Sequence, residues 1–527
     1  MPIAVVWLKR DLRLSDHAPL LEAINSGLPV LLLYCFEPIV VNDKHTSARH
    51  LQFINQSLQD IQHRVPQGAL RCSLDNVTET LTDIHQQFGI SALYSHQEVG
   101  LNSTFERDIE LGQWCEIQGI DWHETPYAAV VRGLSDRQNW DKHWQKVMRA
   151  PLANIDLSVI DWLIDDEAKG SLSRCAASLP NAIGTFQYGG EQSAWQTLTS
   201  FFEGRGQSYA YSLSSPLLSQ THCSRLSAYL AWGNISLRQV YQQLLQHWNT
   251  KGWRRSLVAL SSRLHWHCHF IQKFESESAM EFRPVNRGYI DLPRAEGVAA
   301  MLKLEAWKTG KTGIPIVDAC MRCLIHTGYI NFRMRAMLVS FLTHHLQLDW
   351  RLGVQHLAQL FLDFEPGIHY SQFQMQAGVT GINTIRIYNP VKQGIEKDSD
   401  GEFVKKWLPE LADIPAPLVH SPWMLSPMEQ MMHQVQLGIE YPEPIVDLSQ
   451  SYKAAQSLLW QWRSRPQVKQ EAQRLLQRHV RQGKTQGIKS NLPDKICVGP
   501  VDLSRLFLQQ LVGNLYKAAT LMCGYST

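Results

Sequence analysis

The chain has 527 residues, of which 44% are apolar and 19% are charged, and its formal net charge is +2. These values are ordinary for a folded globular protein, and the length predicts two to four domains at about 100–200 residues each. The nearly balanced charge excludes a uniformly basic nucleic-acid coat. It leaves a local basic face open, because net charge says nothing about distribution.

Ten cysteines are scattered along the chain, which is sparse for a disulfide scaffold and typical of a reducing cytosol. One close pair, Cys320 and Cys323, lies in an apolar helical pattern, so two small helix residues are favoured over a zinc or redox site. The start turns charged at Lys9, too early for a signal peptide, and no apolar run long enough to cross a bilayer follows. We expect a cytoplasmic protein without metal or membrane partner.

Residues 1–130 alternate strand and helix signals. Short apolar runs predict strands at Ile3–Trp7, Val30–Cys35, Ala69–Cys72, Ile90–Tyr94 and Ile120–Trp122. Helical periodicity lies between them at Ala48–Ile61, Val77–Phe88 and Thr104–Ile117. This alternation predicts a doubly wound α/β domain with a five-stranded parallel sheet. No glycine-rich fingerprint follows the first strand, so the pattern does not indicate a bound dinucleotide here.

The rest of the chain divides into three parts. Residues 131–205 predict an extended interdomain connector with short helices, and residues 483–527 form a C-terminal extension. Residues 206–482 predict an all-α domain large enough to bury a large cofactor, with helices at Leu257–Phe274, Gly313–Gly328, Asn331–Leu346 and Gly353–Phe364. Residues 453–484 are basic and amphipathic, which favours a solvated helix face over a nucleic-acid or partner surface.

Two segments carry groups suited to a nucleotide. Tyr211 and Ser224–Ser227 place hydroxyls and an arginine at a predicted helix start, which suits a phosphate, although most serine-rich helix starts are only caps. On the next predicted helix, Arg263, Trp266, His267 and Phe270 share one face. An aromatic pair flanked by cations suits a nucleobase, and a buried tryptophan with satisfied histidines is the alternative.

Two later segments complete the set. Residues 305–319 contain Gly-Lys-Thr without the spacing of a Walker A loop, which excludes a P-loop NTPase. Arg333 and Arg335 precede an acidic pair, Asp363 and Glu365. Such groups form either a buried, charge-paired site or solvated charges on two separate helix faces.

In their order these segments resemble the photolyase and cryptochrome family. Trp307–Ala319 is similar to its W-x-x-G-x-T-G-x-P-x-V-D-A signature, and Ser224–Ser227 to its S-R-L-S flavin-phosphate segment. Val6–Arg13 resembles its first strand and turn, and Ile387–Pro390 with Gly401–Leu411 its closing motif. The resemblance spans roughly residues 3–465. It implies an α/β antenna domain, an all-α FAD-binding domain, UV-damaged DNA as partner, and a monomer.

The resemblance also implies residue roles. The positions around FAD are Tyr211, Ser224, Arg225, Leu226, Ser227, Trp266, Arg335, Asp363, Glu365 and His369. The positions facing DNA or its lesion are Arg263, Trp266, His267, Phe270, Arg333 and Arg386. The positions suited to electron or proton transfer are Trp307, Trp350, His369 and Tyr370. Arg335 and Asp363 are expected to form an ion pair beside the flavin.

The chain also departs from the family pattern in the lesion cavity. Arg263 stands where dimer photolyases carry a glutamate, and His267 where they carry an arginine. Ala336 replaces the cavity methionine, and Phe332 replaces the asparagine before Arg333. A cation donates hydrogen bonds but cannot accept them, so lesion recognition must differ.

Other departures concern the flavin and its electron donors. His369 replaces the asparagine near flavin N5, which suggests either proton exchange there or a satisfied structural histidine. Phe373 replaces the flavin-proximal tryptophan of the electron chain, so Tyr370 or Tyr329 would have to serve instead. Thr104 replaces a folate-binding glutamate, which leaves an antenna pigment of folate or flavin type without an assigned site.

Three functions follow from these observations. The favoured one is blue-light repair of pyrimidine dimers, because the aromatic pair and arginines indicate DNA binding. The second is a cryptochrome-like photoreceptor, which Arg263, Ala336 and Phe373 favour. The third, a light-independent DNA-binding module, predicts a purified protein without flavin.

Overall fold

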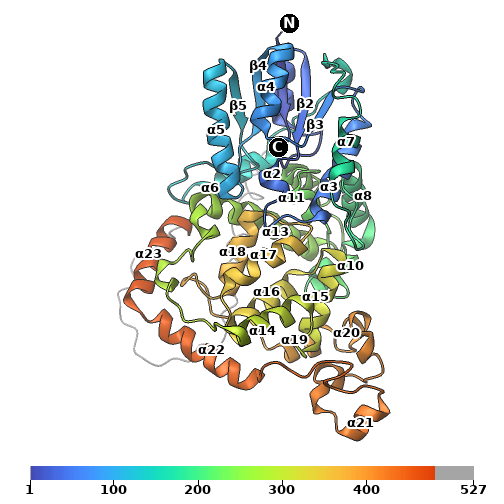
Figure 1. The fold of residues 1–527 in the computed structure, drawn as a ribbon, viewed down its shortest axis with the longest axis vertical. Coiled ribbons are helices and arrows are strands. Elements are labelled where there is room, and N and C mark those ends of the chain that lie inside the picture. Colours follow the sequence, from blue (N-terminus) through green and yellow to red (C-terminus); the bar gives the residue numbers. More distant parts are fainter. Residues whose placement is uncertain (1, 481–527) are drawn as a thin grey trace, which may run out of the picture. The chain divides into compact units, whose positions relative to one another are not determined.

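The computed structural model describes residues 2–480, and the expected extension at 483–527 lies outside them. Its sheet has five parallel strands in the order β3-β2-β1-β4-β5, which confirms the predicted doubly wound topology (Figure 1). The strands are β1 Ile3–Trp7, β2 Val30–Cys35, β3 Leu70–Ser73, β4 Ile90–His96 and β5 Asp121–Thr125. Their helices are α1 Ala18–Asn25, α2 Pro38–Val41, α3 Ala48–Gln62, α4 Val77–Phe88 and α5 Asn102–Gln118.

Strand β1 lies at the centre of the sheet and is buried on both faces. Ala4 and Val6 face the side covered by α1 and α3, whereas Val5 and Trp7 face α4 and α5. This explains why β1 reads as a continuous apolar run, because a central parallel strand has no solvent face.

The connector is more structured than the sequence predicted. It contains α6 Trp140–Arg149, α7 Ser171–Ser178 and α8 Glu191–Ser200, followed by one turn of π-helix, Phe201–Arg205. Helix α7 packs against β3, and Trp162 pairs in parallel with Val30 next to the sheet. The connector therefore completes the α/β domain and is not simply an extended link.

The remaining described residues are helical, as predicted. The helices are α9 Tyr209–Ser212, α10 Ser219–His222, α11 Ser227–Ala231, α12 Leu237–Gln246, α13 Arg254–Ser276, α14 Val298–Thr309, α15 Pro315–Thr327, α16 Phe332–Ser340, α17 Trp350–Leu360, α18 Pro366–Gln376, α19 Pro390–Lys397, α20 Glu402–Trp407, α21 Pro427–Met432, α22 Leu448–Arg463 and α23 Pro466–His479. The single helix expected over Asn331–Leu346 is α16 followed by a π-helical turn, Phe341–His345. No helix among the described residues is long and apolar enough to cross a membrane.

The hydrophobic core on the α1 side of the sheet continues into the helical region. It runs from Val6 through Trp232 to Leu264 and Cys268 on α13. A second core lies among α14 to α18 and includes Trp307, Trp350 and Tyr370. Helix α13 packs against α18, which brings together the helices that carry Trp266 and His369, two of the residues predicted around FAD.

Candidate functional site

Helix α13 carries the predicted aromatic face. Trp266 and Phe270 stack, with ring centroids 5.2 Å apart and planes 25° apart, while Leu264 and Cys268 point into the core. Arg263, one turn earlier, is exposed. The helix therefore presents a stacked pair with a solvent-exposed cation beside it, as its spacing predicted.

The predicted ion pair between Arg335 and Asp363 is confirmed. Nη2 of Arg335 lies 2.8 Å from Oδ2 of Asp363, and its Nε donates to the Ile330 carbonyl oxygen over 2.8 Å. Burial works to raise the pKa of Asp363, but the Arg335 charge outweighs it and holds that pKa below its ordinary value. Ser227 lies close enough to contribute to this lowering. Asp363 is therefore an ionised carboxylate that lies between Arg335 on α16 and Ser227 at the start of α11.

Glu365 is also buried, but its environment has the opposite effect. Its Oε1 accepts from the Gly367 backbone N–H (2.9 Å) and its Oε2 from Arg10 (3.0 Å). Burial nevertheless raises the pKa of this carboxyl above its ordinary value. Arg10 comes from the loop after β1, and its guanidinium also lies 4.8 Å from the centre of the Trp232 ring. In the sequence Arg10 stands out only as part of the predicted first strand and turn. Sequence analysis therefore missed its place at this site.

Several buried polar atoms around these groups have no protein partner. They are Nη1 of Arg225, both ring nitrogens of His267, Oδ1 of Asp363, Oδ1 of Asn331 and Nε of Arg333. Buried polar atoms in folded proteins are nearly always hydrogen-bonded. A set of donors and acceptors from α13, α16 and the segment before α11 therefore indicates a polar ligand.

His267 is the clearest member of this set. Burial lowers its pKa to about 4, so its ring is neutral near pH 7. The sequence left its charge open, and in this structure the ring offers one donor and one acceptor instead of a cation.

Arg225 has an unusual backbone. Its φ of 60° lies in the left-handed region, which non-glycine residues seldom adopt. Its guanidinium lies 3.5 Å from the centre of the Tyr329 ring. Strained residues of this kind cluster at ligand sites, which agrees with the phosphate role that the resemblance implies for Arg225.

The other predicted residues differ in their exposure to solvent. Tyr211 is 69% exposed, and its hydroxyl oxygen accepts from Arg255 over 2.5 Å. Ser224 uses its carbonyl oxygen to accept from Arg205 (3.2 Å), and Leu226 is buried in the core. Arg386 is exposed, and Arg333 approaches Gln393 at 3.5 Å. The hydroxyl of Tyr211 is therefore already hydrogen-bonded to another side chain of the protein.

The aromatic residues of α17 and α18 form a close cluster. Trp350 lies 6.4 Å from Phe373 and 6.2 Å from Tyr370, measured between ring centroids. His369 lies 5.6 Å from Phe373, and its Nε2 is 2.8 Å from the Val354 carbonyl oxygen. A carbonyl only accepts, so Nε2 carries the proton. Burial lowers the pKa of His369 to about 3, which keeps the ring neutral.

Trp307 lies elsewhere in the second core. It is fully buried, and its ring contacts His356 on α17 at 5.8 Å. His356 is almost two turns along α17 from Trp350. The resemblance implies that Trp307 and Trp350 are the outer two residues of the electron chain, and this assignment stays a prediction.

The carboxyl ends of β1 and β4 are the topological switch point of the sheet, where doubly wound folds usually bind ligands. Here ion pairs fill it: Lys9 lies 2.9 Å from Asp108, and Arg107 lies 3.0 Å from Glu98. The hollow beside them measures about 20 Å³, room for a water molecule and not for a pigment. The Thr104 hydroxyl donates to the Leu101 carbonyl oxygen (2.8 Å) at the start of α5.

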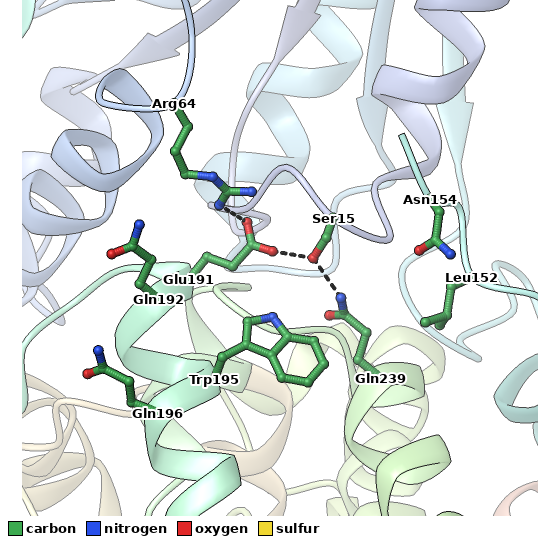
Figure 2. Close-up of a pocket in the computed structure, with 9 residues that line it drawn as sticks. All are labelled: Ser15, Arg64, Leu152, Asn154, Glu191, Gln192, Trp195, Gln196 and Gln239. Atoms are coloured by element: carbon green, nitrogen blue, oxygen red, sulfur yellow. Dashed lines mark hydrogen bonds and ion pairs between the residues drawn. The ribbon is translucent and has the colours of Figure 1, made fainter. Parts of the chain in front are cut away.

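A larger hollow of about 600 Å³ opens beside α8. It is lined by Ser15, Arg64, Leu152, Asn154, Glu191, Gln192, Trp195, Gln196 and Gln239. Figure 2 shows that its polar groups largely bind one another, with Glu191 accepting from both Arg64 and Ser15. None of the residues predicted to bind FAD or DNA lines this hollow.

Two family models match the chain. Residues 4–136 match the model described as DNA photolyase, and residues 259–461 match the FAD binding domain of DNA photolyase. A Cryptochrome DASH of Gloeobacter violaceus is 28% identical over 86% of this chain and 95% of its own. A deoxyribodipyrimidine photo-lyase of Escherichia coli is 28% identical over 85% of this chain and 96% of its own. The solved structure of a Synechocystis cryptochrome aligns with a TM-score of 0.75 at 25% identity, covering 87% and 99% of the two chains.

Proposed function

The chain belongs to the photolyase and cryptochrome family of FAD flavoproteins, and we propose that it uses blue light to repair pyrimidine dimers in DNA. The observation that carries the proposal is the stacked pair of Trp266 and Phe270 beside the unpartnered ring of His267. An aromatic pair with a neutral donor and acceptor at its edge suits an extruded, damaged base.

The residues present fit the cofactor. Arg225 offers an unpartnered guanidinium nitrogen for a phosphate, and Asp363 an unpartnered carboxylate oxygen for a donor on the flavin or its ribityl chain. When bound, FAD supplies the light absorption and the transferable electron, while the protein supplies position and electrostatics. Arg335 and the neutral His369 then surround it without adding an uncompensated charge, because Arg335 is paired and His369 donates to Val354.

The arginines support DNA as the partner. Arg263 and Arg386 are exposed, and Arg333 keeps a buried Nε without a partner. Contacts of arginine to phosphate position a duplex without reading its sequence. We assign Arg333 and Arg386 to the backbone, and Arg263 to the lesion by hydrogen-bond donation.

Two observations favour the second candidate, a photoreceptor without repair activity. By the resemblance, Phe373 replaces the flavin-proximal tryptophan, and its ring lies 5.6 Å from that of His369. By the same resemblance, Ala336 replaces the cavity methionine, and it is buried. The relatives include both Cryptochrome DASH and photo-lyase proteins, so they favour neither candidate.

The eight described cysteines are free and buried, which supports a reducing compartment such as the cytoplasm.

The deciding experiment measures repair of a defined thymine dimer in single- and double-stranded oligonucleotides by the purified, chemically reduced flavoprotein. We expect dimer loss in blue light and none in the dark. Retained dimer in the light, with flavin bound and reduced, would remove dimer repair and leave photoreception.

A matched pair of variants tests the aromatic cavity. Trp266→Ala removes half of the stacked pair and is expected to reduce repair about 10-fold or more, since base–aromatic stacking contributes about 1–3 kcal/mol. Trp114→Ala removes a partly buried tryptophan on α5 in the α/β domain and is expected to leave repair unchanged. Equal activity of the two variants would contradict a lesion-binding role for Trp266.

A further inference from the structure

Tyr370 ends a chain of hydrogen bonds that crosses from α18 to the α/β domain. Its hydroxyl lies 2.7 Å from Nε2 of His45, and Nδ1 of His45 lies 2.6 Å from Oδ1 of Asp43. Tyr370 and His45 are buried, whereas the Asp43 side chain is 19% exposed. The chain therefore connects a buried phenol to the edge of solvent.

The direction of each hydrogen bond follows from the groups. Burial works to raise the pKa of Asp43, but its hydrogen bonds with His45 outweigh this and hold that pKa below its ordinary value. Its carboxylate accepts only, so Nδ1 of His45 carries the proton. In the neutral ring Nε2 then has a free lone pair, and the Tyr370 hydroxyl donates to it.

The ring of Tyr370 is also placed within the aromatic cluster. It lies 6.2 Å from the ring of Trp350 and 6.0 Å from that of His369. Phe373 also lies close to Trp350, with ring centroids 6.4 Å apart. Phenylalanine is very hard to oxidise, so Trp350 and Tyr370 are the oxidisable rings of this cluster.

We propose that Tyr370 is a redox-active tyrosine whose proton passes to His45 when it gives up an electron. This inference rests on the proposed function, because the electron goes to light-excited, oxidised FAD, either directly or through Trp350. The chain would then reduce its own flavin through a tyrosine in place of the missing proximal tryptophan.

The step balances within the residues named. Tyr370 loses one electron, its O–H bond breaks, and the proton forms a new bond to Nε2 of His45. The product is a neutral tyrosyl radical beside a His45 cation, which the Asp43 carboxylate stabilises. When the electron returns to Tyr370, the proton returns from His45, and the starting state is restored.

The nearby proton acceptor makes Tyr370 suitable as an electron donor. Burial raises the pKa of Tyr370 far above its usual range, so the phenol is protonated before the electron leaves. An oxidised phenol is strongly acidic and needs a base within hydrogen-bond distance. Tyr229 is a useful contrast, because its hydroxyl donates to the Tyr188 carbonyl oxygen (3.0 Å), which cannot take a proton.

A purely structural role for the chain is the competing explanation. His45 stacks on Phe364, with centroids 5.5 Å apart and planes 1° apart, so it also joins the α/β domain to the helical region. The test therefore needs a readout that packing alone would not change.

The experiment illuminates the full chain with oxidised FAD bound, freezes it, and records the electron paramagnetic resonance signal. Incorporation of ring-deuterated tyrosine should narrow a tyrosyl signal. We expect Tyr370→Phe to abolish that signal and Tyr229→Phe to retain it. His45→Gln can accept the hydrogen bond but not the proton, so it should slow radical formation about 100-fold, as expected for loss of a positioned base.

Two outcomes would overturn the proposal. One is a tyrosyl signal that persists in Tyr370→Phe, and the other is radical formation in His45→Gln at the rate of the unaltered chain. Both leave the proposed function intact if light still reduces the flavin. A chain purified without flavin would instead overturn the proposed function and this inference together.

Discussion

At the candidate site, single side chains reduce the free-energy cost of burying charge. Arg335 and Asp363 are paired, whereas His267 and His369 avoid the cost by remaining neutral, because burial lowers their pKa values to about 4 and about 3. A neutral ring beside a flavin adds hydrogen bonds without a fixed charge. The net charge of the site is therefore set by the acids and arginines, with Glu365 answered by Arg10.

The Arg335–Asp363 pair gives a prediction at this scale. Asp363→Asn keeps the shape of the side chain but leaves Arg335 without its counter-charge. We expect the free energy of unfolding to fall by roughly 3 kcal/mol, the usual cost of breaking a largely buried pair, and FAD retention to fall with it. Urea unfolding and the flavin-to-protein absorbance ratio measure the two effects.

Asp349→Asn is the matched control. Asp349 lies 2.6 Å from Arg351, whose side chain is 52% exposed, and such pairs contribute about 0–1 kcal/mol. Asparagine also caps a helix as well as aspartate does, so the cap on the Arg351 N–H is kept. Similar losses in the two variants would contradict a special role for the buried pair.

At the scale of elements, the sequence predicts what periodicity controls. Four of the five strands and α4 lie within two residues of their predicted bounds, and β5 ends three residues later than predicted. The agreement is close because each packs one recurring pattern against one core. The packing of the connector at 131–205 could not be predicted, since its short helices have weak patterns and contact distant segments. Helix α6 contacts α12, α7 contacts β3, and α8 contacts α3. Arg10 and His45 were missed because their partners, Glu365 and Tyr370, lie more than 300 residues away.

The basic segment at 453–484 shows the same limit. Its described part forms α22 and α23, and several of its cations are engaged within the protein. Arg474 lies 2.6 Å and Arg478 3.2 Å from Glu277 at the end of α13, while Arg463 donates to the Asn383 carbonyl oxygen. Periodicity predicted α22 and α23, but it could not predict that the Glu277 carboxylate binds two arginines of α23.

Glu277 therefore gives the prediction at this scale. Burial works to raise its pKa, but His479 and Arg474 lower it from 4.5 to about 2. A lowered pKa means that the pairing is complete above about pH 4.5 and is lost as the pH falls toward 2. We expect hydrogen exchange in α23 to accelerate over that range, before the rest of the chain unfolds.

Glu277→Gln should remove this pH dependence and expose α23 at neutral pH. Glu471→Gln is the control, because Glu471 binds the same Arg474 but belongs to α23 itself and cannot attach it to α13. Hydrogen exchange read by mass spectrometry over residues 466–479 checks both variants. Unaltered protection in Glu277→Gln would mean that the apolar contacts of Val468 and Leu475 suffice.

For the described molecule as a whole, the loop after β1 is one of the links between sheet and helices. Arg13 donates to the Gly233 carbonyl oxygen (3.0 Å), and Asn234 donates to that of Leu12 (2.9 Å). The same loop carries Arg10 to Glu365. Stability of the fold and geometry of the site therefore depend on one close approach of two backbones.

Gly233 is where that approach is tightest, and it provides the last prediction. Its φ is 71°, and a Cβ there would overlap the carbonyl oxygen of Arg10 and the Cα of Asp11. Gly27 has the same φ of 71° with open space around it.

Gly27→Ala should cost about 1–2 kcal/mol for backbone conformation alone. Gly233→Ala also introduces a steric clash between the loop and the end of α11. Its free energy of unfolding should therefore fall by several kcal/mol more than that of Gly27→Ala, as measured by urea unfolding. Because this clash displaces Arg10, the Gly233→Ala variant should also release FAD before the chain unfolds. Equal losses in the two variants would show that the loop can move aside, and that Glu365 does not need Arg10 in this exact place to keep the cofactor.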